Sequence, residues 1–454
     1  MEESCPSEAQ PSATVDLLSS NDPLPEAIAA DSAASPDADF GNELFDDFME
    51  SEELDGLEAV SETWAPEHSA ETTIEVKEGA GSWRKKVFPY FRLGGYYDDN
   101  IFISETERES DFVGFAGFGL RAGLGEVVAP LYGLREKRNV PILYETSPPV
   151  PGNFVWADYS GMYRFFLDHS EQSSYDQDLL MRLGWTDGKV TLGLEGRFQS
   201  LSTPDIDAGG RVRRYIFHAG AEVDYQLSEL TSVEADFSYT NVQYTSLIDS
   251  SEFLHESWLN YQLTPKLKVA GGIGVGVLTM QGGPNQPYGR VLVRAVYEYS
   301  PKLSFSGRLG LEYRDVQEGS AFRNNPVFGL GITYAPWDGT FISLEGYRFA
   351  EASAMLAGAD YTITGVDLTV RQRFFQRFIL TLTGGYENWD YRFMPGDSSV
   401  KRNDNYFFGR AAIAFDITRW CNAEIFYSYQ RDSSTYPGNS FTDNLVGIGF
   451  DFAF

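Results

Sequence analysis

The stretch LVGIGFDFAF, residues 445–454, alternates strictly between two kinds of side chain. Large apolar residues occupy every second position, and glycine, aspartate or alanine fills the positions between them. The large apolar residues are Val446, Ile448, Phe450, Phe452 and Phe454. A period of two places alternate side chains on opposite faces of a β-strand, whereas a helix would need a period near 3.6. The stretch therefore predicts a strand with one wholly apolar face.

The same alternation recurs through most of the chain that precedes this stretch. It is strict in residues 190–198, 233–240, 305–314 and 366–371, where apolar positions alternate with polar or charged ones. Short turns and longer polar loops alternate between these segments, and residues 202–211 form one of the polar loops. From this spacing we expect about 18 strands in residues 87–454.

Strands with one apolar and one polar face suit a membrane. A bilayer offers no water to backbone amides, so a sheet that crosses it must close on itself. Such barrels place apolar side chains outside and polar ones inside, with short turns at one end and longer loops at the other. We therefore predict an all-β fold, a closed antiparallel transmembrane β-barrel. A soluble propeller or double sandwich is the rival, but its strands usually run only ~5–6 residues.

The acidity of the chain lies mostly in its N-terminal part. The formal charge is −31, and residues 1–80 hold 22 acidic residues and one base, which gives −21. The rest then holds 44 acidic and 34 basic residues, or −10. Residues 1–86 are poor in apolar side chains and predict a largely disordered periplasmic arm, followed by a barrel of residues 87–454. A mildly acidic barrel has no basic stripe for phosphates, so we expect no nucleic-acid partner.

The sequence lacks the features that mark several other classes of protein. It has no run of 18 apolar residues, which disfavours a transmembrane helix, and its two cysteines lie far apart. No metal-ligand spacing joins its four histidines, and we expect no cofactor. The first residues lack the basic and apolar regions of a signal peptide, although a barrel of this kind requires export. We therefore expect either that the start of the precursor is missing or that its start codon is misassigned.

Two stretches resemble known outer-membrane proteins. The C-terminal alternation that ends in Phe454 resembles the signal that the barrel assembly machinery reads. The run GGYYDDNIFIS, residues 94–104, followed by Ser110-Asp111-Phe112, resembles the putative β-barrel porin type 2 family, and residues 211–244 add to the likeness. That family includes outer-membrane proteins of exopolysaccharide loci. The resemblance implies an outer-membrane location, contact with its lipids, and a role in polysaccharide export or the passage of small hydrophilic solutes.

The polar strand faces supply the candidate pore residues. These are Glu195, Arg197, Arg214, Glu222, Glu234, Asp236, Arg294, Glu298, Arg308, Glu312, Asp367, Arg371, Arg373, Arg410 and Asp416. Charges of both signs in one lumen can order water and pass hydrophilic solutes. They can equally form ion pairs that only neutralise one another. An 18-stranded barrel is wide enough for a channel unless a plug fills it, and the arm or residues 125–152 could be that plug.

Other activities have weaker signals. Asp98-Asp99-Asn100 with Glu105 offers oxygen ligands for Ca²⁺, but a polar strand end that enters a loop explains these residues better, so we predict no metal. His218 and His255 are the strand histidines that a lipid hydrolase could use, and no Gly-x-Ser-x-Gly element accompanies them. We therefore predict a channel and not an enzyme. A non-conducting scaffold or adhesin is the alternative, and the acidic arm is expected to bind a periplasmic partner or to gate the barrel.

Overall fold

The computed structural model describes residues 86–125, 152–316, 322–356, 358–392 and 402–454. Eighteen long strands form one sheet, and two short strands pair separately as a small hairpin. The strands are β1 (Lys86–Asp98), β2 (Asp111–Gly125), β3 (Phe154–Phe166), β4 (Ser174–Asp187), β5 (Val190–Leu201), β6 (Pro204–Asp205), β7 (Gly210–Arg211), β8 (Arg214–Ser228), β9 (Thr231–Tyr244), β10 (Ser250–Thr264), β11 (Leu267–Met280), β12 (Gln286–Ser300), β13 (Leu303–Asp315), β14 (Phe322–Tyr334), β15 (Thr340–Ala352), β16 (Asp360–Phe374), β17 (Phe378–Arg392), β18 (Asn403–Thr418), β19 (Cys421–Ser434) and β20 (Phe441–Ala453).

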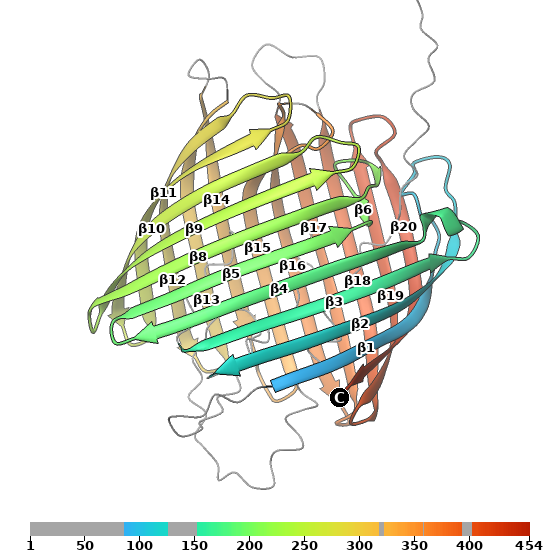
Figure 1. Cartoon of the computed structure of the whole chain (residues 1–454), viewed down its shortest axis with the longest axis horizontal. Coiled ribbons are helices and arrows are strands. Elements are labelled where there is room, and N and C mark those ends of the chain that lie inside the picture. The colour runs from blue at the N-terminus through green and yellow to red at the C-terminus, as the bar shows by residue number, and fades with distance from the viewer. Residues whose placement is uncertain (1–85, 126–151, 317–321, 357, 393–401) are drawn as a thin grey trace, which may run out of the picture.

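The large sheet closes into a barrel (Figure 1). Each strand is antiparallel to its neighbours along the chain, and β1 pairs with both β2 and β20. The seam between the first and last strands runs from the pair Tyr90 and Ala453 to the pair Asp98 and Leu445. The expected closed antiparallel barrel of about 18 strands is confirmed. Residues 1–85, which contain nearly all of the predicted arm, and residues 126–151 lie outside the described part of the chain.

The two ends of the barrel differ in their connections. The chain enters β1 and leaves β20 at the same end, where β4 and β5 are joined by only Gly188 and Lys189. Gly188 adopts φ +57°, a conformation that glycine reaches without steric cost, which permits so tight a turn. We call this the short-turn end. The other end carries longer connections, such as residues 99–110, and we call it the long-loop end.

The outer face of the wall is apolar. Ile273 and Val291 are 66% and 67% exposed, whereas Trp258 and Leu292 on the opposite strand face are 2% and 1% exposed. A large exposed apolar surface of this kind is avoided in water and required in a bilayer. In the described residues, no helix is long and apolar enough to cross a membrane.

The C-terminal strand shows the same division between its two faces. Val446, Ile448 and Phe454 are exposed on the outer face, and Phe450 and Phe452 occupy that face between them. Asp451 is buried on the inner face and pairs with Arg92 of β1, Oδ1 to Nε 3.0 Å. The alternation therefore orients β20 at the seam. That the outer residues act as an assembly signal stays a prediction.

Candidate functional site

The inner wall of the barrel is the candidate functional site. All fifteen predicted pore residues lie on strand faces opposite the exposed apolar side chains and point toward the interior. In β5, for example, Glu195 and Arg197 alternate with Leu194 and Phe198, which are 51% and 38% exposed outside. The strand period thus delivers charge to the lumen. That these residues act in permeation stays a prediction.

At least eight of the fifteen are joined to a partner of opposite charge. Glu312 binds both Arg290 and Arg314, at 2.7 and 2.8 Å, and Arg214 lies 3.6 Å from Asp205. The remaining pairs are Glu195 with Arg182, Arg197 with Asp178, Glu234 with Arg294, Arg308 with Glu256, and Arg410 with Glu424. The charges on the inner wall are therefore largely neutralised by ion pairs. This agrees with the high free-energy cost of a buried charge without a partner.

The densest of these ion-pair networks covers β9 to β13. Trp258 lies at its centre. The guanidinium groups of Arg294 and Arg308 lie 4.4 and 5.3 Å from the centroid of its ring. Arg294 also donates to the Asn260 amide oxygen at 2.8 Å, and Asn260 donates to Glu234 at 3.0 Å. Charged hydrogen bonds and cation–π contacts hold each side chain in one geometry. This part of the inner wall is a closely connected layer of charged, polar and aromatic side chains.

Two patches of the inner wall are more open. Glu222 of β8 lies directly opposite Asp236 of β9, and both carboxylates are half-buried. Arg371 and Arg373 of β16 are also half-buried and lie within electrostatic reach of Asp416. In the ring of eighteen, β16 comes eight strands after β8, so the acidic and basic patches occupy opposite walls. Opposed charges of this kind set up a field across a lumen.

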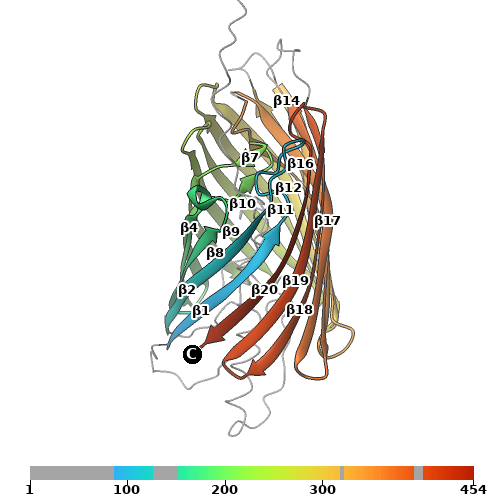
Figure 2. The ribbon, with the colours of Figure 1, turned by 90° about the vertical axis from the view of Figure 1, so that its right-hand side faces the viewer.

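A segment within the connection from β5 to β8 folds into the barrel mouth (Figure 2). We call residues 202–213 the inner hairpin, since it contains β6 and β7. The sequence predicted one of the longer polar loops at residues 202–211, and the structure shows that this loop folds inward. Asp205, Asp207 and Arg211 are 2–4% exposed, because each finds a hydrogen-bonding or ionic partner inside the barrel or in the hairpin itself.

The inner hairpin reaches the far wall of the barrel. Arg402, just before β18, donates to the carbonyl oxygens of Ile206 and Asp207 at 2.8 and 2.7 Å. Its guanidinium also pairs with Asp404 at 2.6 Å and lies 3.5 Å from the Asp207 carboxylate. Ser353, after β15, donates to Asp207 at 3.0 Å. The hairpin thus crosses the mouth at the long-loop end, whereas the two predicted plug segments lie outside the described residues.

Aromatic side chains form the floor on which the inner hairpin rests. Tyr361 stacks on Trp389 at 5.0 Å between ring centroids and contacts Tyr391 at 4.8 Å, with the two rings tilted by 31°. Ile206 of the hairpin packs against this cluster. Because Trp389, Tyr391 and Tyr299 are aromatic residues near strand ends, the sequence predicts that all three belong to interfacial girdles. Tyr299 is 57% exposed outside, but Trp389 and Tyr391 are 1% and 6% exposed and point inward. Their odd-numbered positions share the inner face of β17 with Glu387.

The docking of the inner hairpin should depend on pH. Burial raises the pKa of Asp207 to about 6, an effect that Arg402 opposes and Asp205 reinforces. A released Asp207 would titrate near 3.8, so the docked hairpin binds the proton more tightly. Docking is then strongest below about pH 4 and weakens as the pH rises through 6, by roughly 3 kcal/mol in all. We expect lower conductance at pH 5 than at pH 7.5, and a flatter pH profile for Asp207→Asn.

The three histidines in the described residues have different surroundings. His218 faces inward, 3.0 Å from Thr240 Oγ1 and 4.0 Å from Glu195. His169 lies in the loop after β3, and its two ring nitrogens lie 2.6 Å from the Glu109 carboxylate and 3.0 Å from the Asp111 carboxylate. His255 faces outward and contacts Ser257 Oγ at 3.0 Å. Only the last of these places a hydroxyl next to an imidazole on the lipid side of the wall.

Comparison with known proteins finds similar solved structures but no relative by sequence. No family model matches the chain, and no curated protein matches its sequence. The solved structures similar to it include OpdO of Pseudomonas aeruginosa, with a TM-score of 0.41 and 12% identity over 82% of this chain and 97% of that one. OccAB4 of Acinetobacter baumannii has a TM-score of 0.38 and 11% identity, over 81% and 98%. The siderophore receptor PirA of Pseudomonas aeruginosa has a TM-score of 0.38 and 10% identity, over 81% and 80%.

Proposed function

We propose that the protein is an outer-membrane channel that passes hydrophilic solutes through its charged lumen, with the inner hairpin as its gate. The observation that carries this proposal is the division of one closed wall into an apolar outer face and an ionic inner face. The outer face suits lipid, and the inner face suits water and polar solutes. The two half-buried patches provide charges that a passing solute can contact.

The aromatic floor supports carbohydrate as the solute, and so the narrower role of exopolysaccharide export. Tyr361, Trp389 and Tyr391 present stacked rings beside the Arg402 and Glu387 side chains. Release of the inner hairpin would remove Ile206 from these rings and leave an aromatic surface bordered by polar groups. Rings with polar neighbours suit sugars, which carry apolar C–H faces and hydroxyl edges.

The proposal is tested by single-channel recording of the full chain in a planar bilayer. We expect stable conductance steps, with brief closures that become longer at acidic pH. Addition of a neutral oligosaccharide should block the steps, whereas a monovalent salt alone should not. Flat traces from a protein shown to be folded would contradict the channel and favour a non-conducting scaffold or adhesin.

The two opposed patches should set the ion selectivity. A unit charge about 8 Å from a permeating ion contributes about 0.5 kcal/mol in water, which changes relative permeability roughly twofold per charge. The pair Glu222→Gln and Asp236→Asn should therefore shift the reversal potential toward anion preference. The pair Arg371→Gln and Arg373→Gln should shift it toward cation preference. If both double variants retain the wild-type reversal potential in a salt gradient, these patches do not face the ion path.

A second candidate function rests on the pair Ser257 and His255. The ring nitrogen Nδ1 of His255 lies 2.9 Å from the Asp236 carbonyl oxygen, which can only accept a hydrogen bond. That contact puts the proton on Nδ1 and leaves Nε2 free to accept the Ser257 hydroxyl proton, the arrangement of an activated serine nucleophile. Its position on the outer face would give it access to lipid esters.

The surroundings of this pair favour the channel over the hydrolase. The outward neighbours of the pair in the described strands are Ala235, Phe237, Ile273 and Val275, and none offers a side-chain donor to a developing oxyanion. Ser257→Ala is the decisive variant. Release of fatty acid from phospholipid vesicles by the wild type, lost in Ser257→Ala with conductance unchanged, would establish the hydrolase. Equal release by both proteins would exclude Ser257 as a nucleophile.

A further inference from the structure

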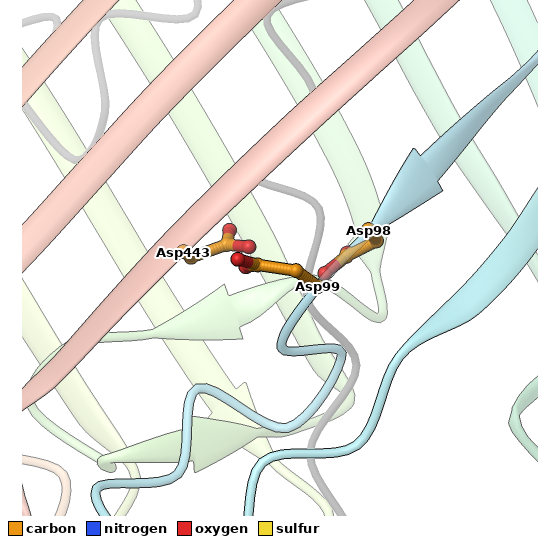
Figure 3. Close-up of side chains that lie close together, drawn as sticks. All are labelled: Asp98, Asp99 and Asp443. Carbon is orange, nitrogen blue, oxygen red and sulfur yellow. The ribbon is translucent and has the colours of Figure 1, made fainter.

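Three carboxylates meet where the barrel closes at the long-loop end (Figure 3). Asp98 is the last residue of β1, Asp99 follows it, and Asp443 is the third residue of β20. One oxygen from each lies within 4.8 Å of the other two. Asp98 and Asp443 are 0% and 1% exposed, so two of the three carboxylates are removed from solvent. The seam between the first and last strands therefore ends in a buried cluster of like charge.

The hydrogen bonds around the cluster leave its centre unsatisfied. Asp98 accepts from the Asn100 backbone N–H at 2.9 Å. Asp99 accepts from the backbone and side chain of Asn444, both at 2.8 Å. The Asp443 Oδ1 atom, by contrast, is buried and receives no hydrogen bond from an amide or hydroxyl donor in the described structure, and Asp443 interacts with the acidic Asp98 instead. A buried acceptor without a partner is rare and costs free energy, so an unpartnered carboxylate oxygen beside two others points to a missing positive ligand.

Nearby basic residues do not provide that charge. Arg108 comes close enough to act electrostatically on Asp443, but it is exposed, and its guanidinium donates to the Thr442 carbonyl oxygen. The residues first considered from the sequence are also engaged elsewhere. Glu105 accepts from the Gly438 backbone at 2.9 Å, and the Asn100 side chain donates to two carbonyl oxygens. Asp443, more than 300 residues away in sequence, completes the group instead.

We propose that Asp98, Asp99 and Asp443 form a divalent-cation site, suited to Ca²⁺, that joins the first and last strands of the barrel. The donors are all oxygen, which Ca²⁺ prefers, and Ca²⁺ accepts a variable coordination geometry. A carboxylate has about four lone-pair sites, so Asp98 and Asp99 can keep their hydrogen bonds while they bind a cation. Water would supply the remaining ligands. The cation would offset the repulsion and fasten the seam.

The test uses the full chain, refolded in detergent, freed of metal with EDTA and titrated with CaCl₂ alone. Calorimetry should give a dissociation constant on the order of 10⁻⁴–10⁻³ M, as in extracellular calcium modules. The thermal midpoint should rise with CaCl₂, since the ion binds the folded barrel. No heat of binding and no rise in the midpoint would overturn the proposal.

Two variants separate this site from general effects of calcium. Asp443→Asn should be at least as stable as the wild type in EDTA and should lose the calcium-dependent rise. Glu107→Gln, an exposed acid in the same loop, should keep the full rise. An equal rise in both variants would place the calcium effect elsewhere and overturn the proposal. If Asp443→Asn does not refold, Asp99→Asn provides the same comparison, because its side chain is partly exposed.

Discussion

The variant Arg402→Met should open the channel. The guanidinium of Arg402 makes two hydrogen bonds to the backbone of the inner hairpin and pairs with Asp207 and Asp404. All of these contacts lie at the long-loop end, where Arg402 is itself buried. Methionine keeps much of the volume but leaves two buried carboxylates without their cation. Breaking a buried ion pair from one side costs about 3–5 kcal/mol, which should loosen the hairpin from the wall around Arg402. We expect larger single-channel conductance and the loss of acid-dependent closure.

Two further variants make this result specific. Arg392→Met removes an arginine at the end of β17 that pairs only loosely with Asp390, at 3.4 Å, and should leave conductance unchanged. Arg402→Lys keeps the charge but cannot reproduce the forked donor geometry, so it should give intermediate conductance. Heat-modified migration on electrophoresis gels would show that each variant is folded. Folded Arg402→Met with wild-type conductance would mean that the inner hairpin is not the gate.

The second large effect is expected at Glu312. Its two carboxylate oxygens hold Arg290 and Arg314, and its side chain is 0% exposed. In Glu312→Gln the amide group turns an N–H donor toward one of the two buried guanidinium groups, and the negative charge that Glu312 places between them is lost. We expect the free energy of unfolding to fall by about 3–5 kcal/mol, measured by urea titration in detergent with tryptophan fluorescence.

Glu222→Gln is the matched control on the same inner wall. Glu222 is half-buried and faces Asp236, an acid, so its neutralisation removes repulsion and not an ion pair. We expect its free energy of unfolding to stay within about 0.5 kcal/mol of the wild type or to rise. Equal losses in the two variants would show that stability depends on lumen charge in general and not on the pairing at Glu312.

The alternation of side chains was sufficient to predict the strands and their two faces. In residues 190–199 of β5 and 303–314 of β13 the apolar and polar positions lie on opposite faces, so Glu195 and Glu312 could be assigned to the inner face from the local pattern. β10 mixes the two kinds. Trp258 faces inward and His255 outward, so its inward acid Glu256, the partner of Arg308, was not among the predicted pore residues. The parity of the flanking strands was the signal that could have found it.

The inner hairpin could not be predicted in this way. Its position depends on contacts such as that between Asp207 and Arg402, which lie 195 residues apart. A polar segment rich in turn residues has the same local pattern whether it extends into solvent or finds partners inside a barrel. The same reason applies to Trp389 and Tyr391, whose burial depends on what covers them. The cluster at the seam likewise needed the closure of β1 against β20 to bring Asp443 to Asp98.

The inner hairpin also has a mechanical consequence. The barrel is broad in one view and narrow in the view at right angles to it (Figures 1 and 2). The inner hairpin is bonded to both walls and so resists changes in the distance between them. Any such change must stretch or compress its hydrogen bonds to Arg402 and Ser353. Lateral tension in the membrane that rounds or flattens the barrel would therefore act directly on the inner hairpin. The shape of the barrel cross-section and the docking of the inner hairpin at the mouth are then mechanically coupled, so that a change in one changes the other.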